Sequence, residues 1–144
     1  MAHVLIGSDH AGFFLKELIK QKLTTEGYSV IDVGCFSESS CDYPVFAADL
    51  CKQIQNGAAT RGILICGTGI GMSMAANRAK GIRAALCANE YQARMSRAHN
   101  NSNVLCLGSR VLGQDLAFSI LEVWLKTEFE GGRHKRRVDL IESL

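Results

Sequence analysis

Five short apolar runs alternate along the chain with longer segments that follow a helical repeat. The apolar runs cover residues 3–7, 29–34, 61–66, 82–87 and 103–108. In the segment 11–27, apolar residues recur at i, i+3 and i+4 opposite a polar face, which predicts an amphipathic helix. Further helices are predicted over 43–57, 71–81, 90–99 and 113–129, with a short final helix over 136–144. Each predicted strand is therefore followed by a predicted helix.

Strands of continuous apolar character, each followed by a helix, indicate parallel pairing in a sheet that is covered on both faces. Five such units predict an α/β protein of the doubly wound, Rossmann-like kind, a three-layer α/β/α sandwich around a five-stranded parallel sheet. The 144 residues contain no linker, repeat or low-complexity stretch, so we expect a single domain over residues 1–144.

In such sheets, ligands bind beyond the carboxyl ends of the strands. The polar and reactive side chains that the predicted topology brings to this edge are Asp9, His10, Asp42, Tyr43, Cys66, Thr68 and Arg110. The sequence Ser8-Asp9-His10 contains the residue types of a catalytic triad. Adjacent residues of an extended chain point to opposite faces, so these three cannot form a relay among themselves.

Composition narrows the function classes. The net charge of +2 is too small to indicate binding to nucleic acid or to a membrane surface, and no segment approaches about 20 consecutive apolar residues. The N-terminus lacks a basic region followed by an apolar core, and none of the six cysteines forms a C-x-x-C pair. We therefore expect a cytoplasmic protein without a zinc site or a disulfide framework.

The segment "CGTGIGMS" (66–73) leaves the third predicted strand through a cysteine and a run of alternating glycines. Its spacing matches neither the G-x-G-x-x-G dinucleotide fingerprint nor the P-loop. A strand-to-helix turn of this kind exposes backbone N–H groups that suit a phosphate or a developing oxyanion. Alternatively, the glycines only allow the strand and the helix to pack closely.

Two side chains have both a structural and a chemical interpretation. Cys66 is either a buried strand thiol, like Cys87 and Cys106, or a reactive thiol whose thiolate the adjacent helix N-terminus favours. His99, near the end of its predicted helix, either caps that helix or takes part in chemistry. The basic segment "GGRHKRR" (131–137) is on its own compatible with a solvated tail.

Five segments match one family when they are taken together and in order. They are "GSDHAG" (7–12), "DYP" (42–44), "CGTGIGMSMAANR" (66–78), "AHNNSNVLCLGSR" (98–110) and "EGGRHKRRV" (130–138). The set resembles ribose-5-phosphate isomerase type B, a family that also contains allose-6-phosphate and galactose-6-phosphate isomerases. The resemblance runs from residue 4 to about residue 142 and is specific as a set, although no single motif would be decisive.

The resemblance implies an aldose–ketose isomerase of the non-oxidative pentose phosphate pathway that needs no metal and no cofactor. It also implies a homodimer, or a dimer of dimers, with active sites at the dimer interface. Cys66 corresponds to the base that moves a proton between C1 and C2 through an enediolate, and His99 to the acid that opens the sugar ring. One branch of the family uses a glutamate base at the position of Met72, so this chain resembles the cysteine branch.

The remaining site positions follow from the same resemblance. Thr68 and the turn amides correspond to the cradle for the enediolate oxygen, and Asp9 to a residue bonded to sugar hydroxyls. The substrate-binding positions are His10, Tyr43, Gly67, Gly69, Gly71, Asn100, Arg110, Arg133 and Arg137. Of these, His10 and the three arginines correspond to the phosphate clamp, and Arg133 and Arg137 are spaced one helical turn apart, so both can face one ligand. In the family, His99, Asn100 and the arginines reach in from the partner subunit.

Three function classes remain distinguishable. An isomerase explains both Cys66 and His99, with ribose 5-phosphate as the favoured substrate and a hexose 6-phosphate as the alternative. A non-catalytic sugar-phosphate binding domain would need the arginines but not both of these residues. A thiol redox protein would need a second cysteine near Cys66, which only a fold contact with Cys35 or Cys41 could supply.

Overall fold

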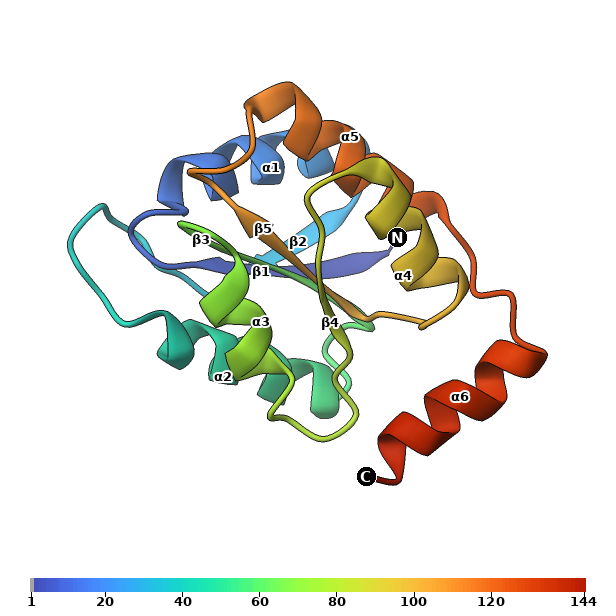
Figure 1. Cartoon of the computed structure of the whole chain (residues 1–144). Helices are drawn as coiled ribbons and strands as arrows, with labels where there is room; N and C mark the ends of the chain where they lie inside the picture. The colour runs from blue at the N-terminus through green and yellow to red at the C-terminus, as the bar shows by residue number, and fades with distance from the viewer. Residues whose placement is uncertain (1) are drawn as a thin grey trace.

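A computed structural model describes residues 2–144 and shows a five-stranded sheet between two layers of helices (Figure 1). The strands are β1 (His3–Ser8), β2 (Ser29–Asp32), β3 (Arg61–Cys66), β4 (Ala84–Leu86) and β5 (Val104–Gly108). The helices are α1 (Phe13–Thr25), α2 (Tyr43–Gln55), α3 (Ile70–Ala76), α4 (Glu90–Ala98), α5 (Gln114–Lys126) and α6 (Arg133–Glu142). All strand pairs are parallel, in the order β2-β1-β3-β5-β4. The predicted three-layer α/β/α fold is confirmed.

Alternating side chains of the central strands divide the core into two halves. Ile63 and Ile65 of β3 pack against α1, α4 and α5, while Leu64 and Cys66 pack against α2 and α3. Buried parallel strands carry apolar residues on both faces for this reason, which explains their continuous apolar runs. The side chain of Cys66 therefore faces the layer that contains α2 and α3.

The structure corrects several predicted boundaries. The final helix begins at Arg133, three residues before the expected start, because Gly131 and Gly132 take positive φ values of 70° and 55° and turn the chain into it. Helix α3 ends at Ala76 and not near residue 81. The side chain of the following residue, Asn77, pairs with both backbone groups of Ala84, at 2.8 and 3.0 Å, which holds the chain in a turn.

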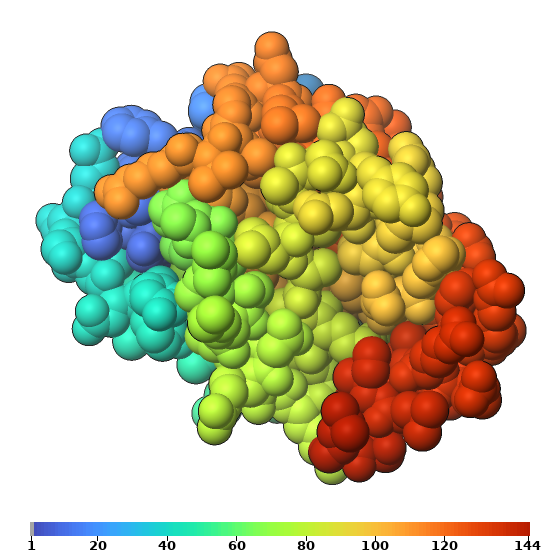
Figure 2. Space-filling model, in the orientation of Figure 1, coloured from blue at the N-terminus to red at the C-terminus, as the bar shows by residue number. Residues whose placement is uncertain are grey.

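Helix α6 lies outside the two helical layers. Its buried residues are His134 and Val138, whereas Leu140 and Ile141 are 57% and 46% exposed. In the space-filling view α6 forms the ridge at the lower right, next to the connection between α3 and β4 (Figure 2). Among the helices that the structure describes between residues 2 and 144, none is both long and apolar enough to cross a membrane.

Candidate active site

Cys66 is the last residue of β3, and its thiol is held by the turn that follows. The backbone N–H of Gly69 donates to Cys66 Sγ at 3.1 Å, and only 5% of Cys66 is exposed. Gly69 has φ 79° and ψ −14°, a left-handed conformation in which glycine carries no steric penalty. An N–H group aimed at sulfur stabilises a thiolate more than a thiol. The glycine turn thus places at least one of its amides on Cys66 itself.

The other two glycines of the turn allow side chains from distant segments to approach. A Cβ atom on Gly67 would lie 3.4 Å from Arg110 Cδ and Nη1, and one on Gly71 would lie 2.6 Å from the ring of Tyr43. The backbone N–H of Arg110 also donates to the Gly67 carbonyl at 2.9 Å. Tyr43 and Arg110 therefore both lie against the turn, as predicted from the positions of their segments after β2 and β5.

Asp9 and His10 lie at the same edge of the sheet, immediately after β1. Asp9 is 7% exposed, its N–H donates to the Ile65 carbonyl, and its Oδ1 accepts a bond from the Gly12 N–H at 3.1 Å. His10 Nδ1 accepts a bond from the Cys41 N–H at 3.2 Å. A neutral imidazole that accepts at Nδ1 carries its proton on Nε2, so His10 can donate from Nε2 to a bound anion.

The remaining thiols have environments unlike that of Cys66. All six cysteines are free. Burial raises the pKa of Cys51 to about 11 and that of Cys87 to about 11, and it raises the pKa of Cys106 well above the usual range. These three are core thiols, whereas Cys41 contacts His10 through both its backbone and its sulfur. Cys35 is also buried, with its sulfur 3.8 Å from the Ser8 hydroxyl. Among the cysteines of the described residues, Cys66 is the one whose Sγ accepts a bond from a backbone N–H.

Of the predicted site residues, His99 and Asn100 lie at the opposite edge of the sheet from Cys66. Helix α4 runs back from the end of β4, so His99 and Asn100 lie close to the start of β5. At that end of the sheet the Asn103 carbonyl accepts a bond from the N–H of Gly62, near the start of β3. Gly62 and Cys66 are four residues apart on one strand, which corresponds to about 13 Å. Cys66 and His99 of one chain are therefore too far apart to act on one sugar. Helix α6, which carries Arg133 and Arg137, also lies on the side of the molecule away from the end of β3 (Figure 1).

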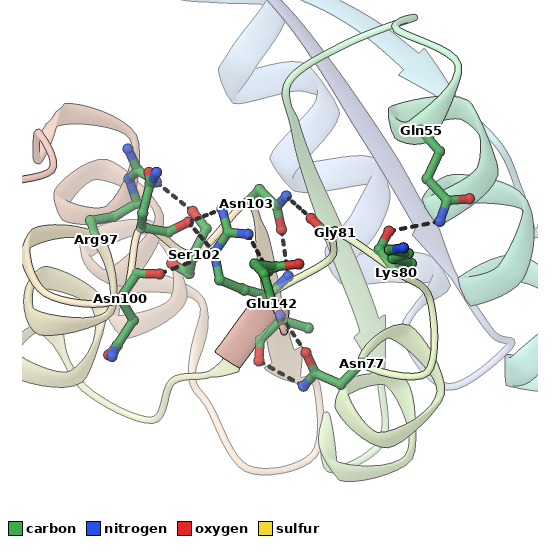
Figure 3. A network of polar contacts seen from close by, with 12 residues as sticks. Gln55, Asn77, Lys80, Gly81, Arg97, Asn100, Ser102, Asn103 and Glu142 are labelled. Carbon is green, nitrogen blue, oxygen red and sulfur yellow. Dashed lines mark hydrogen bonds and ion pairs between the residues drawn. The ribbon is translucent and has the colours of Figure 1, made fainter. Parts of the chain in front are cut away.

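A polar network that was not predicted from the sequence lies around Asn100 and Glu142 (Figure 3). The Arg83 guanidinium donates to the carbonyls of Asn100 and Asn101 at 3.2 and 2.9 Å and to the Glu142 carboxylate at 2.6 Å. Asn101 has φ 48°, an uncommon value that the network holds in place. Arg83 thereby connects the segment that follows α4 to the C-terminal end of α6. The signal in the sequence was a cation, Arg83, within the otherwise apolar run 82–87.

A surface groove of about 830 Å³ lies between the α3–β4 connection and the end of α6. Asn100, Ser102 and Ile141 line it, and Cys66 does not. Asn100 is the only predicted site residue in its lining, so the groove is not the site formed around Cys66 and the turn after it. Near that turn the surface is open and apolar, with Ile70 and Met74 of α3 46% and 67% exposed and Tyr91 of α4 67% exposed.

Comparisons with known proteins show the family to which the chain belongs. The family model described as Ribose/Galactose Isomerase matches residues 4–141. Ribose-5-phosphate isomerase B of Escherichia coli K12 is 46% identical over 144 residues, which covers 100% of this chain and 97% of that protein. The solved ribose-5-phosphate isomerase B of Clostridium thermocellum superimposes with a TM-score of 0.97 at 52% identity, covering 98% of this chain and 95% of that one. The enzyme of Mycoplasma genitalium, solved with bound ribulose-5-phosphate, gives a TM-score of 0.93 at 43% identity, covering 98% and 94%. The chain belongs to the ribose/galactose isomerase family.

Proposed function

We propose that the protein interconverts ribose 5-phosphate and ribulose 5-phosphate, with Cys66 as the base. The observation that carries this proposal is the Gly69 N–H on Cys66 Sγ in a member of a sugar-phosphate isomerase family. A thiolate stabilised in this way removes the proton from C2 of the open-chain aldose and returns it to C1. The proton transfer needs a base close to a donor for the developing oxyanion; Cys66 is that base, and the turn after it supplies the donors.

The other side chains divide between the enediolate, the sugar and the phosphate. Thr68 and the free amides of the turn stabilise the enediolate oxygen, while Asp9, Tyr43 and Asn100 orient the sugar hydroxyls. His10, Arg110, Arg133 and Arg137 bind the phosphate, for which planar guanidinium groups are well suited. His99 donates the proton that opens the furanose ring.

We further propose that each active site is completed by a second copy of the chain. Cys66 and His99 lie at opposite edges of the sheet, so one copy supplies Cys66, Asp9 and His10, and its partner supplies His99 with the two arginines of α6. The exposed apolar side chains of α3 and α4 are suited to an interface next to Cys66. A twofold dimer of this kind contains two identical sites.

Two measurements test the proposal. The first is the conversion of ribose 5-phosphate by the purified protein, with allose 6-phosphate in parallel; turnover of only the hexose would keep the mechanism and change the substrate. The second mixes the variants Cys66→Ala and His99→Ala, each expected to lose at least about 100-fold in kcat.

After subunit exchange between these two variants, half of the dimers are hybrids with one intact site of two. The mixture should then regain about a quarter of the wild-type activity. If native mass spectrometry shows hybrids and the activity does not return, the shared site is wrong.

A further inference from the structure

His99 is part of a compact cluster with two residues that the proposed function does not use. The rings of His99 and His134 stack with centroids 4.0 Å apart and planes inclined by 8°. Glu130 Oε1 lies 3.9 Å from His99 Nε2 and 3.5 Å from His134 Nε2. Both distances are in the range of ion pairs, so one carboxylate oxygen faces two imidazoles.

The backbone fixes this arrangement independently of the side chains. The Glu130 N–H donates to the Ala98 carbonyl at 3.0 Å, directly next to His99. The His134 N–H donates to the Gly131 carbonyl at 3.0 Å in the turn that starts α6. The end of α4 and the start of α6 are thus joined through the residue whose carboxylate lies between the two rings.

The two rings differ in their surroundings. His134 is 8% exposed, and burial lowers its pKa, as do the positive charges of His99, Arg133 and Arg137, against the opposing effect of Glu130. The neutral form of His134 is therefore favoured. His99 is more open, with 38% of its side chain exposed, and it is the C-cap residue of α4.

The same three residues also have the composition of a metal site, since their ligand atoms lie within 4.8 Å of one another. Parallel stacked rings, however, present their Nε2 lone pairs side by side and not toward a common point. A metal ion placed between them would lie far from the plane of each ring, which is poor imidazole coordination. The geometry instead suits one positive charge shared by a carboxylate and two rings.

We propose that Glu130 and His134 are positioning residues that hold His99 as the proton donor for ring opening, an inference that rests on the proposed function. Glu130 faces Nε2 of the His99 imidazolium, which leaves Nδ1–H for the substrate, and the neutral His134 ring fixes the plane of His99 by stacking. In the step itself, the C1–O4 bond of the furanose breaks and O4 takes the His99 proton. The C1 hydroxyl gives its proton to water as the aldehyde forms, and solvent then reprotonates His99.

The test compares ribose 5-phosphate with 4-deoxyribose 5-phosphate, which has the same length but lacks the ring oxygen and stays open. Glu130→Gln and His134→Ala should each lower kcat/KM for ribose 5-phosphate by about tenfold, a part of the 10²- to 10⁴-fold that general acid catalysis supplies. Both variants should stay within about threefold of the wild type on the 4-deoxy substrate, because the Cys66 steps do not need His99. His134→Phe keeps a stacking face and should recover most of the ribose 5-phosphate rate.

The exposed carboxylate Glu122, which pairs with Lys126 on α5, gives a matched control, and Glu122→Gln should change neither rate. Equal losses on both substrates would show a structural role and overturn the inference. A His134→Phe variant as poor as His134→Ala would overturn the role of stacking. A wild-type protein inactive on both substrates would instead overturn the proposed function, and this inference with it.

Discussion

Replacement of Gly69 by alanine tests whether the glycine turn controls Cys66. A Cβ atom at this position would lie 2.5 Å from Leu86 Cδ1 and 2.9 Å from the carbonyl carbon of Leu107, and the residue has φ 79°. The left-handed conformation costs alanine about 1 kcal/mol, and overpacking against a backbone carbonyl costs about 2 kcal/mol more. We therefore expect a loss of about 3 kcal/mol in the free energy of unfolding.

Gly57 provides the matched control, because it has φ 85° and nothing within 4 Å of a built Cβ. Gly57→Ala should cost only the conformational term, about 1 kcal/mol. The difference of about 2 kcal/mol between the variants corresponds to about 6 °C in Tm for a chain of this size. Differential scanning calorimetry at equal protein concentration measures it.

The same substitution should affect catalysis, because relief of the clash moves the Gly69 N–H away from Cys66 Sγ. A hydrogen bond to a charged group contributes about 1.5–3 kcal/mol, so kcat should fall at least about tenfold in Gly69→Ala and remain unchanged in Gly57→Ala. If Gly69→Ala is no less stable than Gly57→Ala and keeps kcat within twofold, the assigned role of the turn is refuted.

Two further predictions concern stability. Lys16 is fully buried and bonded to Asp32, and although burial alone would raise the pKa of Asp32, hydrogen bonds from Lys16 and Lys20 outweigh it and lower that pKa. Asp32→Asn leaves the buried Lys16 ammonium with Glu17, 3.0 Å away and 42% exposed, as its remaining carboxylate. The change should therefore cost about 2 kcal/mol in urea unfolding at pH 7, and the added change Lys16→Met should restore most of it; no recovery would show that Glu17 alone compensates the charge. Burial raises the pKa of Cys51 to about 11. Below about pH 9 the thiol is protonated in both the folded and the unfolded state, so its contribution to stability is complete. As pH rises from 9 to 11, the unfolded state loses this proton first, and the free energy of unfolding falls by about 1.4 kcal/mol per pH unit. In Cys51→Ala, the free energy of unfolding should fall less steeply with pH above about 9, by the slope that corresponds to one proton. An unchanged slope would show that Cys51 ionises normally in the folded protein.

The sequence was sufficient for the fold because its signals are local. The residues of β3, 61–66, were predicted without error, since a continuous apolar run identifies a buried parallel strand. Boundaries were less accurate where side chains bond to the backbone outside their own element, as Asn77 does at the end of α3. The start of α6 was missed because the conformations of Gly131 and Gly132, and not a hydrophobic pattern, decide it.

The site divides in the same way. Adjacent strand ends place Asp9, Tyr43, Cys66 and Arg110 at one edge of the sheet, and the alternation of strands and helices alone determined that. Only the tertiary structure decided that the Gly69 N–H bonds to the sulfur, that Arg83 ties α4 to α6, and that Glu130 lies between two stacked histidines. These contacts join residues through bond directions and side-chain conformations, which no periodicity along the chain encodes. The pattern of buried and exposed positions follows from the order of residues along the chain. The direction of a single polar group depends instead on every element packed around it.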